Sequence, residues 1–232
     1  MTVLEHLAEL RTRLMYIFGA LTIGAIPGWF AYRDALRILL EPAEPYLPEG
    51  QLIVTSPVDA FSLRLKIALY IGFALAFPFV LFHVWRFIAP GLRAQEKRYV
   101  IPFVISGMLL FSVGIWVAFY TLPQAMAFLI GPRITGPQVV PLLAARQYID
   151  FMLRYLVVFG LTFQFPIVLM FLTISRAVSS KQLARYRRHV VLVIAVVGAV
   201  ATPPDPVSMM ILSGALYALF ESCIWLSRLL RR

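Results

Sequence analysis

The chain alternates long apolar runs with short polar segments, and most of the runs are long enough to cross a membrane. A helix needs about 20 apolar residues to cross the ~30 Å hydrocarbon core of a bilayer. The pattern predicts six transmembrane helices, at about residues 14–32, 61–88, 99–122, 148–175, 188–202 and 206–226. We therefore expect an all-α membrane protein whose 232 residues form a single polytopic membrane domain.

The fifth and sixth helices are predicted to be short. The uncharged run at residues 190–201 has twelve residues, which cover about 18 Å at ~1.5 Å per residue. The segment TPPDP follows, and Asp205 before Pro206 is a favourable helix start, because Asp caps the first amides and Pro fits the first helical position. Two short helices joined by a tight turn imply a locally thinned bilayer or packing that hides their ends.

Outside the spans, the polar segments predict amphipathic and proline-rich elements. Residues 1–13 carry apolar side chains at helical spacing, which indicates an amphipathic helix on the membrane surface that runs into the first span. Residues 33–60 and 123–147 are predicted outer loops rich in proline, with a short amphipathic helix at 33–40. Pro78 in the second span predicts a bend.

Basic residues set the expected orientation. Most of the 21 Lys and Arg residues lie near the two termini and after the second and fourth spans, whereas most of the 11 acids lie on the other side. The positive-inside rule therefore predicts that both termini are cytoplasmic. In a soluble protein, a net charge of +10 would suggest nucleic acid as a partner. Here the chain is 61% hydrophobic and its bases cluster between apolar runs, so the charge is read as an orientation signal and no nucleic acid partner is expected.

Acidic residues are rare on the expected cytoplasmic face, where only Glu5, Glu9 and Glu96 lie among many bases. One interpretation is that each acid forms a weak, solvated ion pair with a neighbouring arginine, as exposed acids commonly do. The other is that Glu9 and Glu96 together form a negative spot for a cationic ligand, since a carboxylate binds a guanidinium strongly and in a bidentate manner. Composition alone favours the first.

Two polar side chains lie within predicted spans. Gln164 precedes Pro166, which frees a backbone carbonyl in the preceding turn that the Gln164 amide or water can satisfy. Glu221 is the acid deepest in a span, which makes it a candidate functional residue. Pairing of Glu221 with a basic loop residue is at least as good an explanation, because it lies near the cytoplasmic end of its span.

The sequence predicts neither a catalytic nor a metal centre. The three histidines are scattered, no nucleophile motif is visible, and a single cysteine, Cys223, excludes an internal disulfide. We therefore expect a protein that is not an enzyme and has no cofactor.

Several motifs, taken together, resemble the TatC family, the multispanning subunits of the twin-arginine protein translocase. The matching segments are HLAELRTRL at 6–14, SP at 56–57 ahead of Phe61 and Lys66, FAFPFVLFHVWRFIAPGL at 75–92 followed by Glu96, FGLTFQFP at 159–166 and TPPD at 202–205. Their order and spacing match over essentially the whole chain. The resemblance implies a cupped bundle of six helices in the bacterial cytoplasmic (inner) membrane.

The resemblance also implies a receptor for signal peptides that carry two consecutive arginines, on proteins that are exported folded at the expense of the proton-motive force. It places seven residues on the recognition surface, with Glu96 as the expected arginine contact: Glu9, Arg11, Arg13, Phe87, Pro90, Leu92 and Glu96. Pro42 and Asp205 match outer-side motif positions. Gln164, Pro166 and Glu221 are the candidates for partner docking or for an intramembrane polar role. The implied partners are TatA- and TatB-type single-span subunits, the lipid bilayer and further copies of the chain within a larger complex.

Three positions depart from the family pattern. Gln164 stands where many members have glutamate, so neither a permanent charge nor a protonation step is required there. His83 replaces a frequent glutamine, and Arg93 a frequent tyrosine. The alternative function is an ion- or solute-coupled transporter with Gln164 and Glu221 along its path, which predicts charged or broken helices that meet near mid-membrane.

Overall fold

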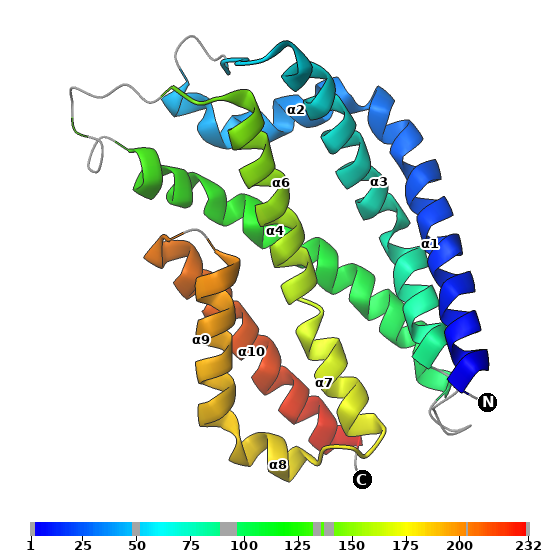
Figure 1. The fold of residues 1–232 in the computed structure, drawn as a ribbon. Coiled ribbons are helices and arrows are strands. Elements are labelled where there is room, and N and C mark those ends of the chain that lie inside the picture. Colours follow the sequence, from blue (N-terminus) through cyan, green and yellow to red (C-terminus); the bar gives the residue numbers. More distant parts are fainter. Residues whose placement is uncertain are drawn as a thin grey trace. The chain divides into compact units, whose positions relative to one another are not determined.

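The structure, a computed structural model, describes residues 3–47, 52–88, 97–131, 136, 142–202 and 204–230. Within these ranges the chain is helical apart from turns and one isolated bridge that pairs Ile53 with Ala144. The elements shown in Figure 1 are α1 (Val3–Phe30), α2 (Tyr32–Leu40), η1 (Glu41–Tyr46), α3 (Pro57–Ile88), η4 (Lys97–Tyr99), α4 (Val100–Ile130), α6 (Ala145–Thr162), α7 (Phe165–Ile174), α8 (Ser180–Arg185), α9 (Arg187–Ala201) and α10 (Pro206–Leu230).

Five helices in the described part of the chain are long and apolar enough to cross a membrane. They cover Leu4–Phe30, Pro57–Ile88, Val100–Ile130, Ala145–Ile174 and Pro206–Leu229. The helix α9 has 15 residues and is about 22 Å long, which is shorter than the hydrocarbon core. A sixth crossing, made by α9, therefore stays a prediction.

The prediction of a short sixth helix is wrong, because α10 has 25 residues and a length of about 37 Å. The predicted end at residue 226 was placed before Ser227 and Arg228. The helix accommodates both residues, because the Ser227 hydroxyl is satisfied by the carbonyl of Ile224 at 2.8 Å and a cation such as Arg228 is favourable in a last helical turn.

The prediction that the amphipathic start runs into the first span is confirmed, because both form one continuous helix, α1, on which Glu9 and Arg13 pair with each other along the same face. One other predicted boundary is wrong. The second outer loop was predicted to begin at residue 123, but α4 continues through Pro123 to Ile130. A membrane helix tolerates proline where its surroundings compensate for the lost hydrogen bond.

Other local predictions are confirmed. The short helix predicted at 33–40 is α2, and the predicted interruption of the fourth span is the turn at residues 163–164 between α6 and α7. The predicted basic loop contains the short helix α8, which begins at a capping box formed by Ser179 and Gln182.

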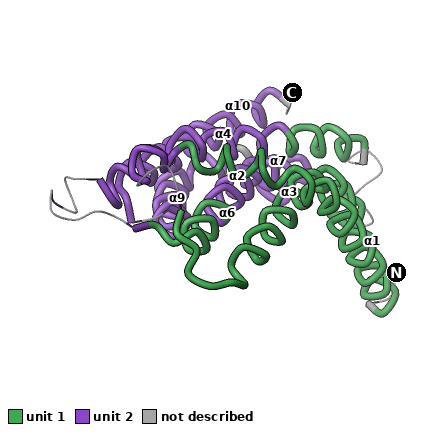
Figure 2. The backbone as a smooth tube through the Cα atoms, turned by 90° about the horizontal axis from the view of Figure 1, so that it is seen from above, with its two compact units in different colours: residues 1–41, 52–108, 143–153 green, residues 42–51, 109–142, 154–232 purple. Residues whose placement is uncertain are grey.

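The chain forms two compact units, coloured separately in Figure 2. Unit 1 comprises Met1–Glu41, Leu52–Met108 and Leu143–Leu153, and unit 2 comprises Pro42–Gln51, Leu109–Leu142 and Arg154–Arg232. Each unit is described below by itself.

Unit 1 is built on the close packing of α1 against α3, which run side by side (Figure 1). Glycines allow the two backbones to approach: a Cβ atom added to Gly24 would lie 2.7 Å from the carbonyl oxygen of Gly72, and one added to Gly28 would lie 2.6 Å from that of Ala68. Small residues four apart are a common packing surface of membrane helices, because they let the backbones come into contact.

Two ion pairs connect α3 to the start of α6 within unit 1. In one pair the base belongs to α3, and in the other it belongs to α6. Lys66 Nζ lies 2.5 and 2.7 Å from the two carboxylate oxygens of Asp150, and an Arg146 nitrogen lies 3.5 Å from Asp59. Arg64 lies over the ring of Trp29, at 4.3 Å from its centroid. The basic side chains near the start of α3 and α6 thus contact carboxylates or an aromatic ring of the protein.

Unit 2 has a core of large aromatic side chains with a close helix crossing. Phe159, Phe163 and Phe220 are fully buried. A Cβ atom added to Gly114 of α4 would lie 2.9 Å from the carbonyl oxygen of Phe159 in α6, so α4 and α6 also meet through a glycine. Next to this crossing, the hydroxyl groups of Thr121 and Tyr155 lie 2.8 Å apart.

Candidate functional site

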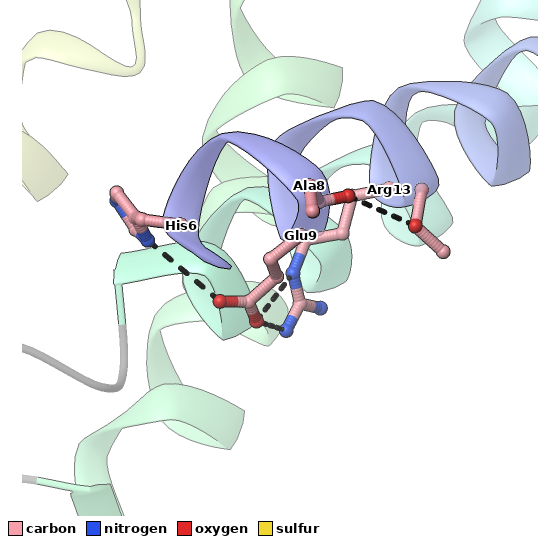
Figure 3. A network of polar contacts seen from close by, with 5 residues as sticks. His6, Ala8, Glu9 and Arg13 are labelled. Atoms are coloured by element: carbon pink, nitrogen blue, oxygen red, sulfur yellow. Dashed lines mark hydrogen bonds and ion pairs between the residues drawn. The ribbon is translucent and has the colours of Figure 1, made fainter. Parts of the chain in front are cut away.

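The first turns of α1 and the last turn of α3 bring together three of the predicted recognition residues, Glu9, Arg13 and Phe87. A fourth side chain, His6, contacts both Phe87 and Glu9. We call these four residues the N-terminal cluster; Figure 3 shows its α1 part. All four belong to unit 1. The helical spacing of residues 6, 9 and 13 places their side chains on one face of α1.

Glu9 is held by its own helix. Arg13 Nε donates a hydrogen bond to Glu9 Oε1 at 3.0 Å, and Arg13 Nη2 contacts the same oxygen (Figure 3). The side chains of Glu9 and Arg13 are only 18% and 13% exposed. Glu9 thus forms an ion pair with a neighbouring arginine, as the first interpretation of the acids expects. Both contacts use Oε1, so Oε2 remains for other contacts.

His6 connects Glu9 to α3. Its ring stacks on the ring of Phe87, with centroids 4.2 Å apart and an interplanar angle of 11°. Its Nδ1 atom lies 3.7 Å from Glu9 Oε2, beyond hydrogen-bond distance. Sequence reasoning missed His6, although it begins the HLAELRTRL motif and lies one helical turn before Glu9.

His83 lies one turn before Phe87 and is buried among aromatic rings. Its ring centroid lies 4.3 Å from that of Phe79 and 5.6 Å from that of Tyr16 on α1. Only 7% of His83 is exposed. Where the resemblance predicts a glutamine, His83 is thus a packing residue.

Of the remaining predicted recognition residues, the structure describes Arg11, which is not part of the cluster and lies on an exposed side of α1. Pro90, Leu92 and Glu96 fall outside the described residues, so their roles stay predictions.

At the break between α6 and α7, Gln164 completes the hydrogen bonding of its own helix. The backbone amide of Gln164 donates to Leu161 at 2.9 Å, and its side-chain amide donates to the Gly160 carbonyl at 3.4 Å. The Pro166 carbonyl is in turn 3.5 Å from the buried Cys223 thiol of α10, which donates to it. Gln164 thus satisfies the Gly160 carbonyl, which its own backbone amide leaves free by donating to Leu161, and not the Thr162 carbonyl that Pro166 frees.

An apolar groove of about 260 Å³ lies beside this break. Leu161, Thr162 and Phe165 line it at the break, and the other lining residues come from α9 and α10: Val193, Ile194, Val197 and Leu216. All belong to unit 2.

Glu221 is paired with a basic residue. Its carboxylate accepts hydrogen bonds from Arg187 at 2.7 Å and from the Tyr217 hydroxyl at 3.1 Å. This contact joins the start of α9 to α10 and agrees with the pairing interpretation.

The outer-side motif positions are both buried. Pro42 lies in η1. Asp205 is 2% exposed, and its Oδ1 accepts a hydrogen bond from the Ser208 amide at 2.7 Å. This is the N-cap that the TPPDP sequence predicts. Both residues belong to unit 2.

Comparison with known proteins assigns the chain to a family. The profile of the family described as Sec-independent protein translocase protein (TatC) matches residues 5–214. The Sec-independent protein translocase protein TatC of Aquifex aeolicus (strain VF5) is 36% identical over 233 residues, covering 100% of this chain and 97% of that protein. The protein of the same description from Carboxydothermus hydrogenoformans is 32% identical, covering 100% of this chain and 94% of that protein.

Solved structures agree. A crystal structure of the twin arginine translocase receptor TatC superposes with a TM-score of 0.79 at 36% sequence identity, covering 98% of this chain and 100% of that chain. A second crystal structure of that receptor, in DDM, gives a TM-score of 0.80 and covers 96% and 99% of the two chains. With its membrane-length helices the protein is a multi-pass membrane protein, and the chain belongs to the TatC family of Sec-independent protein translocase proteins.

Proposed function

We propose that this protein is a receptor for twin-arginine signal peptides in the bacterial cytoplasmic membrane, and that it passes folded cargo to a translocase driven by the proton-motive force. The observation that carries the proposal is the N-terminal cluster, in which Arg13 holds the Glu9 carboxylate and the His6 ring joins that carboxylate to the Phe87 ring at the end of α3. The solved relative described as a twin arginine translocase receptor supports the same role.

Recognition of the arginine pair rests on charge and shape. Glu9 supplies a partly desolvated carboxylate, and a charge-assisted hydrogen bond in such surroundings is stronger than one in water. Glu96, which follows α3 in the sequence, is proposed to contact the peptide arginines directly. Arg11 and Arg13, with Phe87, Pro90 and Leu92, would complete the surface. Lysine would be a poor substitute for arginine, because an ammonium group has no planar fork of donors.

The break at Gln164 is the proposed docking place for TatA- and TatB-type single-span subunits. Apart from Thr162, the apolar groove beside it is lined by side chains of Leu, Val, Ile and Phe, which suit a transmembrane helix. Further copies of the chain are proposed to join the same complex. Since the sequence contains no recognisable hydrolytic motif, the energy is proposed to come from the proton-motive force.

Peptide binding tests the receptor role. Full-length protein in lipid nanodiscs is titrated with a labelled twin-arginine signal peptide and with the same peptide carrying two lysines. The twin-arginine peptide should bind more tightly, and Glu9→Gln should weaken it by roughly 10- to 100-fold, the equivalent of one hydrogen bond to a charged group.

Leu4→Ala is the matched control, because Leu4 is 79% exposed and lies on the same turns of α1. Equal affinity of wild-type protein for the two peptides would rule out the proposal. The transporter alternative receives no support from Glu221, which is engaged with Arg187 and Tyr217.

A further inference from the structure

The imidazole of His6 lies against the Phe87 ring and the Glu9 carboxylate, two groups that together would also suit a guanidinium. Its face is parallel to the Phe87 ring at 4.2 Å, and its Nδ1 atom lies 3.7 Å from Glu9 Oε2. Figure 3 shows this nitrogen directed at the carboxylate. A flat, nitrogen-bearing ring therefore contacts an aromatic face on one side and a carboxylate oxygen at its edge.

The two oxygens of Glu9 are not equivalent. Oε1 accepts the hydrogen bonds of Arg13. Oε2 is buried and has no hydrogen-bond partner among the residues that the structure describes. A buried carboxylate oxygen without a partner is costly, and a donor that reached it would be bound strongly. The oxygen that remains for a ligand is thus the one against which His6 lies.

A phenyl face beside a carboxylate oxygen is the environment that a guanidinium group prefers. The guanidinium is planar, so it stacks on an aromatic ring while its edge donates to a carboxylate. An ammonium group has no flat face and would use the carboxylate alone.

We propose that His6 is a placeholder for an arginine side chain. In the ligand-free protein its imidazole occupies a subsite formed by the Phe87 ring and Glu9 Oε2, and an incoming guanidinium displaces it. This rests on the proposed receptor function and adds to it an autoinhibitory residue, because displacing the ring offsets part of the affinity for an arginine side chain.

The expected gain in peptide affinity follows from the stacking of His6 on Phe87. A parallel pair of aromatic rings contributes an amount equivalent to about 2- to 12-fold in affinity. Replacing His6 by Ala removes the competitor, so affinity for a twin-arginine peptide should rise by about 2- to 10-fold. Affinity for the twin-lysine peptide should rise less, so the ratio of the two affinities should increase. His6→Phe keeps a ring on Phe87 and should not show this gain.

The test compares wild-type protein, His6→Ala, His6→Phe and the control Leu4→Ala in nanodiscs, with both peptides. The His6 side chain is 46% exposed, and the close packing of α1 on α3 lies at Gly24 and Gly28, several turns away, so its replacement should leave that packing in place. A partly unfolded sample would bind both peptides less in the same proportion, and the affinity ratio therefore reports on the site alone. A His6→Ala ratio equal to or below that of wild type overturns the inference, as does an equal gain for His6→Phe.

A second measurement follows the displacement itself. The chain has three histidines, so the His6 ring signals of isotope-labelled protein can be assigned by their loss in His6→Ala. The stacked ring should show a ring-current shift from Phe87 that disappears when twin-arginine peptide saturates the protein. An unchanged His6 signal at saturation overturns the placeholder role even if wild-type protein prefers the twin-arginine peptide. Lack of that preference would instead reject the receptor function.

Discussion

Neutralising Asp150 alone is expected to destabilise the protein more than removing both Asp150 and its partner Lys66. Lys66 lies nine residues after the first residue of α3, about 14 Å along the helix axis, and thus within a membrane-length helix. Its ammonium group contacts both oxygens of Asp150, at 2.5 and 2.7 Å. Asp150→Asn would leave that ammonium without its counter-charge.

The magnitude follows from the depth and exposure of the pair. An unpaired Lys at the centre of a membrane helix costs about 2.5–3.5 kcal/mol on insertion scales. Lys66 lies short of the helix centre and its side chain is 31% exposed, so the expected cost of Asp150→Asn is lower, about 1–3 kcal/mol. The double variant Lys66→Met, Asp150→Leu removes both charges and should stay within about 1 kcal/mol of wild type, because apolar replacement of a whole ion pair is often neutral.

Denaturant unfolding of wild-type protein, Asp150→Asn and the double variant in detergent micelles measures the difference. Arg33→Gln is the matched control, since Arg33 is an exposed basic residue outside the ion pairs described above. A double variant that is as unstable as Asp150→Asn, or less stable, would show that the pair stabilises unit 1 by its charges, and would refute the reasoning.

Three further predictions concern packing, capping and the α9–α10 contact. Gly28→Leu should cost about 1–3 kcal/mol of unfolding free energy, because its Cβ would press on Ala68; Gly19→Leu, with open space at its Cβ, should be near neutral, and equal losses would contradict the packing. Asp205→Ala should lower stability by about 1 kcal/mol through loss of the cap on Ser208, whereas Asp205→Asn should retain most of it in the same thermal unfolding assay. Glu221→Gln should leave peptide affinity unchanged and change stability by less than about 1 kcal/mol, because its ion pair is partly exposed; a loss of peptide binding would contradict this.

Features fixed by neighbouring residues could be predicted from the sequence. The start of α10 follows from Asp205 and Pro206, and the break in the fourth span follows from Gln164 and Pro166, because caps and proline effects act within one helical turn. The helix ends at Ile130 and Leu230 were misplaced. Proline and arginine near the end of an apolar run are read as stops, yet a membrane helix accommodates both when its polar groups are satisfied.

Contacts between distant residues could not be predicted in this way. Lys66 and Asp150 are 84 residues apart, and the sequence around each residue does not predict that the other is its partner. His6 shows the same limit: its spacing from Glu9 is visible in the motif, but its stack on Phe87 depends on how α1 packs against α3. Gly24, Gly28 and Gly72 set that packing, and their role follows only once the two helices are known to be neighbours.

Site-specific crosslinking from position 96 tests the central claim most directly. A photoreactive residue replaces Glu96 or, as a control far from it in sequence, the exposed Val54, and the protein is exposed to a twin-arginine signal peptide in native membranes. Crosslinks are expected from position 96 and not from position 54, and they should be lost when the two arginines are changed to glutamines. Crosslinks from position 96 that persist unchanged with the glutamine peptide would contradict the assignment of this protein as a twin-arginine receptor.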